Sequence, residues 1–246
     1  MKQPELIFIP GWGMEKQVWD PLLPYFQEYS VWHVEWRGVK ELSEFAERVA
    51  EAAREQDVIL IGWSLGALAA LRACDRVRVK GLILIGGTAK FTVDENYESG
   101  WKLPFVERMK RSLVKRKDDT LERFYKSMFT KQEIKDSEQF EDIAERFQGD
   151  SIESLQLGLD YLIEMDMRSQ LKYVKMPVLL LHGEQDAICP LSAARYIQEN
   201  TNGALKVING AGHALCVTDS EYCANEIIQF VEVIQNDQQN VITKTI

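Results

Sequence analysis

The sequence predicts an α/β fold in which a mostly parallel, doubly wound sheet carries a helical cap inserted between two of its strands. Three observations lead to this prediction. Short apolar runs alternate with segments of helical periodicity, most runs are apolar on both faces, and the alternation stops between residues 88 and 175. Runs that are apolar on both faces are typical of parallel strands covered by helices on each side.

Six apolar runs and four helical patterns make up the regular part of the chain. The expected strands are residues 6–9, 31–36, 58–61, 82–85, 178–181 and 205–208. The expected helices of the same part are residues 41–55, 65–74, 191–201 and 219–235. Connections between parallel strands are expected to be right-handed.

The interruption of the alternation predicts the cap. Amphipathic helices are expected within it at residues 101–116, 120–129, 137–147 and 152–165. An insertion between two strands lies over the carboxyl edge of the sheet, where ligands bind in open α/β folds. We therefore expect a core of residues 1–88 and 172–236 and a cap of residues 89–171. The polar residues 237–246 are expected to form a flexible tail.

Composition excludes several classes of protein. A chain of 246 residues is long enough for one α/β domain with a large core. No apolar run approaches the roughly 20 residues of a membrane span, and no basic-then-apolar leader begins the chain, so a cytoplasmic enzyme is expected. The net charge of −9 argues against general nucleic-acid binding. The four cysteines show no C-x-x-C spacing and are expected to be reduced thiols, with no metal or organic cofactor required.

The most specific motif is Gly62-Trp63-Ser64-Leu65-Gly66, which follows an apolar run and precedes an alanine- and leucine-rich helical pattern. This strand–turn–helix context is the one that a G-x-S-x-G nucleophile elbow requires. The turn is so tight that side chains two residues before and after the serine would clash, which explains Gly62 and Gly66. Ser64 is therefore predicted to be a nucleophile.

A serine hydroxyl needs a base to remove its proton, and the chain has three histidines. His33 and His182 lie within or at the end of expected strands, where packed structural histidines are the favoured interpretation. His213 lies in a glycine-containing loop after the last strand, from which an imidazole can reach the elbow. His213 is the predicted base.

The third member of such a site is an acid that fixes the tautomer of the histidine. In enzymes with this elbow, the chain order is serine, acid, histidine. Asp186 follows an expected strand and precedes His213, so it is the predicted acid. Glu184 is interpreted as a solvated loop charge, and Asp160 and Asp166 as surface charges of the cap.

Backbone N–H groups normally stabilise the oxyanion that forms during acyl transfer. Leu65, the residue after the nucleophile, is expected to supply one. The glycine-rich turn at residues 10–13 follows the first strand, and its Trp12 is the expected second donor. The alternative for residues 10–13 is an ordinary turn that ends a strand.

At these residues the chain resembles the pimeloyl-acyl carrier protein methyl ester esterase family of biotin synthesis, within the α/β-hydrolase superfamily. The matching motifs are Pro10-Gly11-Trp12-Gly13, Val18-Trp19, the elbow, Gly158 to Ile163, Asp166-Met167-Arg168 with Leu171, Met176-Pro177, Gly183 to Asp186, Pro190 and Gly212-His213-Ala214. The resemblance implies an α/β-hydrolase fold, with Ser64, Asp186 and His213 as nucleophile, acid and base. It also implies oxyanion amides at Trp12 and Leu65. The chain departs from the family at Pro10, where a histidine is usual, and in a shortened loop at residues 35–39.

In that family, basic residues of the cap hold acyl carrier protein. Arg123 lies in a matching cap motif, although Asp119 stands where the family has another arginine. Residues 102–117 hold seven basic side chains against the single acid Glu107. Arg111, Lys115 and Arg123 are therefore candidates for binding an acidic carrier protein. The alternative is a solvated helix face with no partner.

Together these inferences predict a monomeric serine hydrolase that cleaves carboxylic esters, most specifically the methyl ester of pimeloyl-acyl carrier protein. Trp12, Trp63 and Phe124 are expected to line the acyl pocket, with core packing as the alternative for each. A broad short-chain carboxylesterase or a thioesterase would use the same three residues. An α/β-hydrolase fold that only binds a ligand is the alternative outside enzymes. No membrane or nucleic-acid partner is expected.

Overall fold

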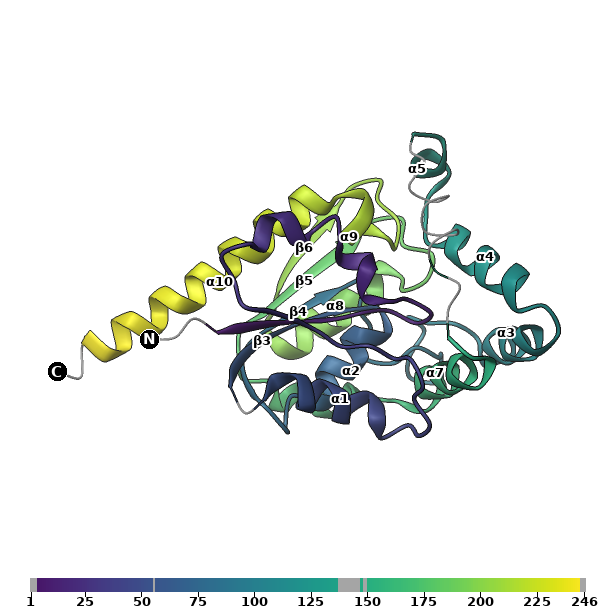
Figure 1. Cartoon of the computed structure of the whole chain (residues 1–246), viewed down its shortest axis with the longest axis horizontal. Coiled ribbons are helices and arrows are strands. Elements are labelled where there is room, and N and C mark those ends of the chain that lie inside the picture. Colours follow the sequence, from purple (N-terminus) through teal and green to yellow (C-terminus); the bar gives the residue numbers. More distant parts are fainter. Residues whose placement is uncertain (1–3, 55, 137–146, 148–149, 244–246) are drawn as a thin grey trace.

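A six-stranded sheet in which every pair of neighbours is parallel lies at the centre of the fold (Figure 1). Its strand order is β2-β1-β3-β4-β5-β6. The strands are β1 (Glu5–Ile9), β2 (Val31–His33), β3 (Asp57–Trp63), β4 (Arg78–Ile85), β5 (Val178–Gly183) and β6 (Ala204–Ile208). This computed structural model describes residues 4–54, 56–136, 147 and 150–243, and for residues 237–243 it describes the backbone alone. The six predicted strands and their parallel arrangement are confirmed.

The strands differ in length from the sequence prediction, and for β2 and β4 the local reason can be named. β2 ends at His33, because the chain then turns inward and the indole N–H of Trp36 donates to the carbonyl of Pro10 at 2.9 Å. β4 begins at Arg78, earlier than its apolar run, because Arg78 pairs with Asp57 of β3 at 2.6 Å. A search for apolar runs does not detect a strand end that is held by a cross-strand ion pair.

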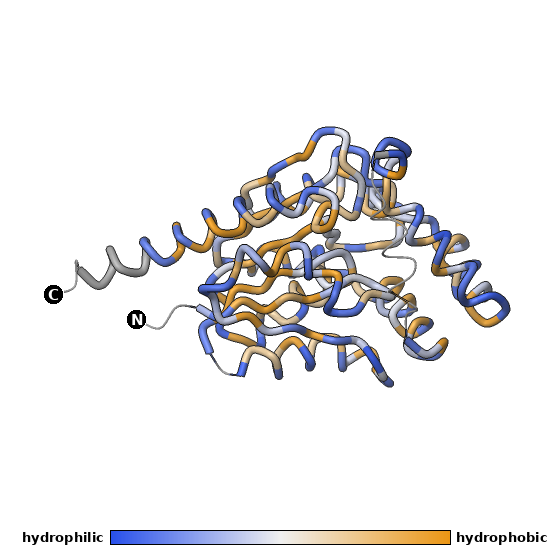
Figure 2. The backbone as a smooth tube through the Cα atoms, turned by 45° about the horizontal axis from the view of Figure 1, so that its top comes forward, coloured by the Kyte–Doolittle hydropathy of each residue, from blue (hydrophilic) through white to orange (hydrophobic). Residues whose placement is uncertain are grey.

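Helices cover both faces of the sheet. The helices outside the cap are α1 (Glu44–Ala53), α2 (Leu65–Ala73), α8 (Leu191–Thr201), α9 (Leu215–Thr218) and α10 (Ser220–Thr243), with short 3-10 helices η1 (Lys16–Trp19), η2 (Leu23–Phe26) and η3 (Arg168–Tyr173). Helices α1 and α2 lie on one face and α10 lies on the other (Figure 1). All residues of β1 and β5 are buried in consequence. Figure 2 shows the strands as the hydrophobic interior, with mixed colours on the outer helices.

The cap is helical, as predicted, and enters between β4 and β5 beyond the carboxyl ends of the strands (Figure 1). Its described helices are α3 (Leu103–Lys115), α4 (Lys117–Ser127), α5 (Lys131–Asp136) and α7 (Ile152–Glu164). The sequence did not predict α5. The helix expected at residues 137–147 lies outside the described residues except for Phe147. The exact boundaries of the cap at residues 89 and 171 stay a prediction.

The last helix is longer than expected. α10 continues to Thr243, so helical backbone extends into the segment that was expected to be a tail from residue 237 (Figure 1). Its apolar face ends near the buried Ile234, but neither glycine nor proline follows to end the helix. Among the described residues, no helix is both long enough and apolar enough to cross a membrane.

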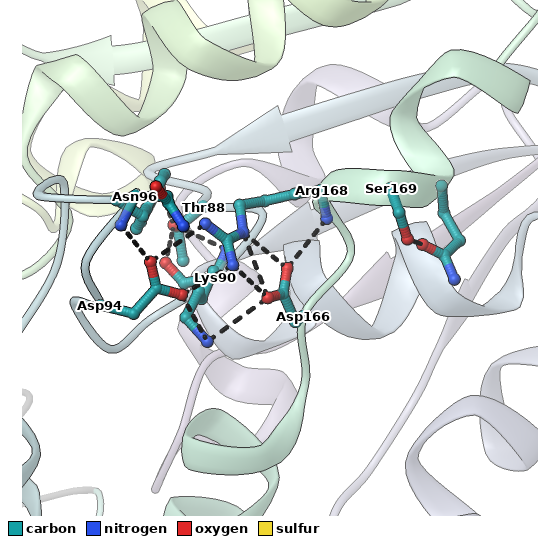
Figure 3. A network of polar contacts seen from close by, with 9 residues as sticks. Thr88, Lys90, Asp94, Asn96, Asp166, Arg168 and Ser169 are labelled. Carbon is teal, nitrogen blue, oxygen red and sulfur yellow. Dashed lines mark hydrogen bonds and ion pairs between the residues drawn. The ribbon is translucent and has the colours of Figure 1, made fainter.

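A network of charged side chains joins the two ends of the cap where it leaves and rejoins the core (Figure 3). The guanidinium of Arg168 lies between Asp94 and Asp166, at 2.7 and 2.6 Å, and Lys90 pairs with Asp166 at 3.4 Å. Asp94 and Lys90 come from the outgoing segment, and the other two residues come from the returning one. The interpretation of Asp166 as a plain surface charge was therefore wrong. Periodicity alone could not reveal a partner more than seventy residues away in the sequence.

This network predicts a pH-dependent contribution to stability. Hydrogen bonds from Arg168 lower the pKa of Asp166 to about 2, whereas an unfolded aspartate titrates near 3.9. The stabilisation is therefore present above about pH 4 and is lost as the pH falls toward 2. We expect Asp166→Asn to cost about 1 kcal/mol near pH 7, a modest value because solvent screens this one-third-exposed side chain.

Thermal unfolding of both proteins from pH 7 to pH 2.5 checks this expectation. The difference in Tm between the wild type and Asp166→Asn should shrink at the acidic end. A difference that stays constant over the whole range would mean that the charge of Asp166 does not stabilise the cap base.

Candidate active site

The elbow at Ser64 has the sharp geometry that its glycines predict. Ser64 joins β3 to α2 with a φ of 57° and a ψ of −118°, a conformation that non-glycine residues rarely adopt. A Cβ on Gly62 would lie 2.4 Å from the carbonyl oxygen of Gly66. A Cβ on Gly66 would lie 2.1 Å from the carbonyl oxygen of Ile9. Any side chain at either position would therefore push the serine out of this turn.

The structure brings Asp186 and His213 together. Nδ1 of His213 lies 2.7 Å from Oδ2 of Asp186, and both side chains are buried. The other oxygen of Asp186 accepts hydrogen bonds from the backbone N–H groups of Ile188 and Cys189, at 2.8 and 2.9 Å. A carboxylate oxygen accepts hydrogen bonds and an imidazole N–H donates one, so Nδ1 of His213 is the donor in this contact. Nε2 of His213 is then left with its lone pair.

That lone pair is available for chemistry. Nε2 of His213 is buried and has no hydrogen-bond partner among the described residues, so it makes no hydrogen bond to Ser64 Oγ in this structure. Hydrogen bonds between a nucleophile and its base are often longer before substrate binds and tighten in the reacting complex. The arrangement is thus that of a buried base held from one side and unpartnered on the other.

Trp63 connects the elbow to the loop that carries His213. Its indole N–H donates to the backbone carbonyl of His213 at 3.0 Å, and the two ring centroids are 5.6 Å apart. Trp63 was expected to line the acyl pocket, but it is fully buried and is absent from the lining of the cavity beside Ser64. Core packing, the alternative interpretation, describes it better, with the added contact to His213.

The turn at residues 10–13 lies beside the elbow. A Cβ built on Gly11 would be 3.3 Å from Cβ of Ser64, so a larger residue there would crowd the serine. Leu65 is the first residue of α2, where N–H groups have no partner within the helix. The chain around Ser64 therefore brings the segments that carry the Trp12 and Leu65 amides to the serine. Their role as oxyanion donors stays a prediction.

A small apolar cavity opens at Ser64 beneath the cap. Its volume is about 10 Å³, which is room for about one water molecule. Trp12 and Phe124 are among the residues that line it, with ring centroids 4.9 Å apart in an edge-to-face arrangement, and their contact with an acyl chain stays a prediction. The rest of its lining is Phe91, Trp101, Val106, Met109, Leu159, Leu162 and Ile188. Because most of these residues belong to the cap, a substrate that reaches Ser64 through this cavity has to displace cap side chains.

A larger cavity of about 310 Å³, which the sequence did not predict, is also lined by Trp12. Trp36 and Phe45 contribute apolar wall, whereas Arg37 and Glu15, which form an ion pair, contribute polar lining. Trp12 is therefore shared by the two cavities. Its Nε1–H donates to the carbonyl of Leu155 in α7 at 2.8 Å, which holds the ring in that position.

His182 is a packed histidine, as predicted, and it lies beside the loop that carries Asp186. Its Nε2–H donates to the carbonyl of Cys189 at 2.7 Å and lies 3.4 Å from Oδ2 of Asp186. Burial lowers the pKa of His182, so the ring is neutral. It supports the loop that carries Asp186. His33, which is half-buried near the edge of the sheet, also has its pKa lowered by burial.

The predicted carrier-protein residues lie exposed on the cap. Arg111 and Lys115 are on α3 and Arg123 is on α4. Arg111 is 67% exposed and only loosely paired with Glu107, at 3.9 Å. Lys110 differs, because its ammonium is bound by Asp160 of α7 and holds two cap helices together. The surface of α3 also exposes apolar side chains that the sequence analysis did not identify, namely Leu103, Phe105 and Val114.

The fold and this arrangement agree with comparisons to known proteins. A family model described as "Alpha/beta hydrolase family" matches residues 6–226. The chain belongs to this family. It is 29% identical over 235 residues to a pimeloyl-acyl-carrier protein methyl ester esterase from Pseudoalteromonas atlantica, covering 89% of this chain and 90% of that one. A protein of the same name from Vibrio campbellii is 28% identical and is covered to 94%, with 92% of this chain aligned.

Solved structures of other proteins share the fold. A bromoperoxidase from Bacillus anthracis superposes with a TM-score of 0.82 at 22% identity, covering 94% of this chain and 92% of that one. Since that protein carries a different name from the esterases, the fold alone does not assign a substrate. The chain is thus a hydrolase of the alpha/beta hydrolase family, distantly similar to these esterases over most of its length.

Proposed function

We propose that this hydrolase is a serine esterase that cleaves the methyl ester of pimeloyl-acyl carrier protein. The observation that carries the chemistry is the 2.7 Å contact between Nδ1 of His213 and Asp186. It leaves Nε2 of His213 without a hydrogen-bond partner in the part of the chain that the structure describes. Trp63 of the Ser64 elbow donates to the backbone carbonyl of the same histidine. The substrate is proposed from the two esterases that resemble the chain across about nine-tenths of its length.

The proposed reaction begins when Ser64 Oγ attacks the ester carbonyl and Nε2 of His213 takes its proton. Asp186 accepts the Nδ1–H of His213 and stabilises the imidazolium that forms. The amides of Leu65 and Trp12 donate to the oxyanion of the tetrahedral intermediate. His213 then protonates the departing methanol, and water repeats the sequence on the acyl-enzyme, releasing the acid and restoring Ser64.

The decisive experiment compares turnover of pimeloyl-acyl carrier protein methyl ester with a series of small esters and thioesters. A preference of about 100-fold or more in kcat/KM for the carrier-protein ester supports the proposed substrate. Equal or better turnover of short-chain esters indicates a broad carboxylesterase, and a preference for thioesters indicates a thioesterase. Absence of all turnover and of fluorophosphonate labelling would leave a binding protein. Rescue of growth without biotin in a strain that lacks the esterase tests the same substrate in cells.

The basic surface of the cap gives a separate prediction about carrier-protein binding. Reversing charge at Arg111, Lys115 and Arg123 should lower kcat/KM for the carrier-protein ester about tenfold or more, because it repels an acidic partner. Hydrolysis of a small p-nitrophenyl ester should change less than twofold. The loss should diminish at high salt, which screens exposed charges.

Charge reversal at exposed basic residues of the core provides the matched control. Lys172, Lys175 and Arg195 are exposed outside the cap helices, and their reversal adds the same net charge. This control should leave both substrates unaffected. If the two triple variants weaken carrier-protein turnover equally, the effect comes from net charge and the cap surface is not the docking site.

A further inference from the structure

The loop that carries His213, residues 209–214, is attached to the cap as well as to the core. The backbone N–H of His213 donates to the carbonyl of Met128 at 2.7 Å, just beyond the end of α4. The N–H of the preceding residue, Gly212, donates to Oε1 of Glu133 in α5 at 3.0 Å. Two successive backbone groups of this histidine loop therefore depend on acceptors that belong to the cap.

Glu133 is held in place by its own helix. The N–H of Glu133 donates to the hydroxyl of Thr130 at 3.2 Å, and the N–H of Thr130 donates to Oε2 of Glu133 at 2.6 Å. This reciprocal pair is a capping box. One oxygen of the Glu133 carboxylate thus fixes the start of α5, and the other oxygen binds the histidine loop.

Gly212 makes the close approach between the loop and the cap possible. A Cβ at this position would lie 2.6 Å from the carbonyl oxygen of Met128 and 2.8 Å from Oε2 of Glu133. The loop and the cap therefore pack so closely that the residue before His213 has no room for a side chain. A rigid acceptor and a closely packed donor together restrict where the backbone of His213 can lie.

We propose that Glu133 is a positioning residue that makes the alignment of His213 depend on closure of the cap. The inference rests on the proposed role of His213 as base. Cap residues also form most of the lining of the cavity at Ser64, which holds about one water molecule, so a substrate that reaches Ser64 through this cavity has to displace cap side chains. Movement of the segment 128–133 away from the core would break both hydrogen bonds to the loop. The base is then fully aligned only after the cap has closed over the substrate, as in other enzymes whose closure completes the catalytic arrangement.

The competing explanation is that Glu133 only caps α5 and has no effect on His213. Variants of the capping box distinguish the two explanations. Thr130→Val removes the hydroxyl that caps α5 but leaves the Glu133 carboxylate and Met128 carbonyl for the loop. Glu133→Ala removes both functions, whereas Glu133→Gln keeps one acceptor oxygen, which can serve the N–H of Gly212 or that of Thr130 but not both. Lys135→Ala, at an exposed position of the same short helix, controls for general disturbance of α5.

The test measures kcat and KM of these four variants with a small p-nitrophenyl ester. It also follows the ¹H NMR signal of the proton between His213 and Asp186. We expect Glu133→Ala to lower kcat about tenfold with KM within twofold, and to broaden this signal through faster exchange with solvent. Glu133→Gln should recover most of the activity, and Thr130→Val and Lys135→Ala should stay within twofold of the wild type.

Two outcomes would overturn the inference. One is a Glu133→Ala variant whose kcat and NMR signal match the wild type. The other is an equal loss in Thr130→Val, which would assign the effect to the stability of α5. The NMR measurement needs no turnover. A wild-type protein without esterase activity, whose signal still weakens in Glu133→Ala, would therefore contradict the proposed function while leaving the positioning role intact.

Discussion

Replacing Ser64 with alanine is expected to lower kcat/KM for ester hydrolysis by about 10⁵- to 10⁶-fold, the largest effect of any single change in this chain. In the proposed mechanism, the variant loses the atom that forms the covalent bond to the acyl group. The other proposed catalytic groups, which are His213, Asp186 and the amides of Trp12 and Leu65, keep their positions but have no nucleophile to activate. Stopped and continuous assays with a p-nitrophenyl ester, together with fluorophosphonate labelling, measure the loss directly.

Folding of this variant should be unaffected. Serine and alanine both carry a Cβ, so the cost of the positive φ at this position is the same in each. The Tm should stay within about 2 °C of the wild type, which rules out unfolding as the cause of any lost activity. Retention of labelling or of more than a hundredth of the activity in Ser64→Ala would exclude Ser64 as the nucleophile.

Local constraints explain why so much of the elbow could be predicted from the sequence. A Cβ at Gly62 would clash with Gly66 of the same five-residue motif, and a Cβ at Gly66 would clash with Ile9 of the neighbouring strand β1. A short motif is therefore enough to predict the turn. The strands were predictable because runs such as β5 are buried on both faces and therefore apolar throughout. The contact between Asp186 and His213 was predictable because each follows a strand at the same edge of the sheet.

Contacts between segments far apart in the chain could not be predicted in this way. Glu133 reads as an ordinary helical charge in the sequence, and only the fold brings its carboxylate to Gly212, 79 residues further along the chain. The same is true of Arg168, whose partner Asp94 lies 74 residues earlier. Trp63 was assigned to the pocket because aromatic side chains suit both pockets and cores, and the sequence does not say which side of the turn it occupies.

These missed contacts share a feature that bears on mechanism. The charged network of Arg168 joins the two ends of the cap to each other, whereas Glu133 and Met128 fix the cap to the histidine loop. These are two of the places where the cap is held, and the second involves His213, the proposed base. Weakening the first is expected to change stability, and weakening the second is expected to change turnover.

Changing Asp186 to asparagine is expected to lower kcat by about 10⁴-fold while the fold is retained. The amide is isosteric with the carboxyl group, but its orientation is dictated by the protein. The position of Oδ1 faces the N–H groups of Ile188 and Cys189, so the amide oxygen must lie there. The NH₂ group then points at Nδ1 of His213, which must accept a hydrogen bond. His213 is forced into the tautomer with its proton on Nε2 and is unable to take a proton from Ser64.

The tautomer can be observed independently of the rate, because ¹⁵N NMR distinguishes protonated from bare imidazole nitrogens. We expect Nδ1 of His213 to carry the proton in the wild type and Nε2 to carry it in Asp186→Asn.

Glu184→Gln is the matched control, since it makes the same isosteric change in a neighbouring exposed carboxylate that accepts a hydrogen bond from Gly210. The control should keep full activity and the wild-type tautomer. If the kcat of Asp186→Asn stays within tenfold of the wild-type value, a different group orients His213, and the proposed role of Asp186 as the acid is wrong. A rate loss with the wild-type tautomer preserved would instead mean that the negative charge of Asp186, and not the orientation of the imidazole, is what catalysis requires.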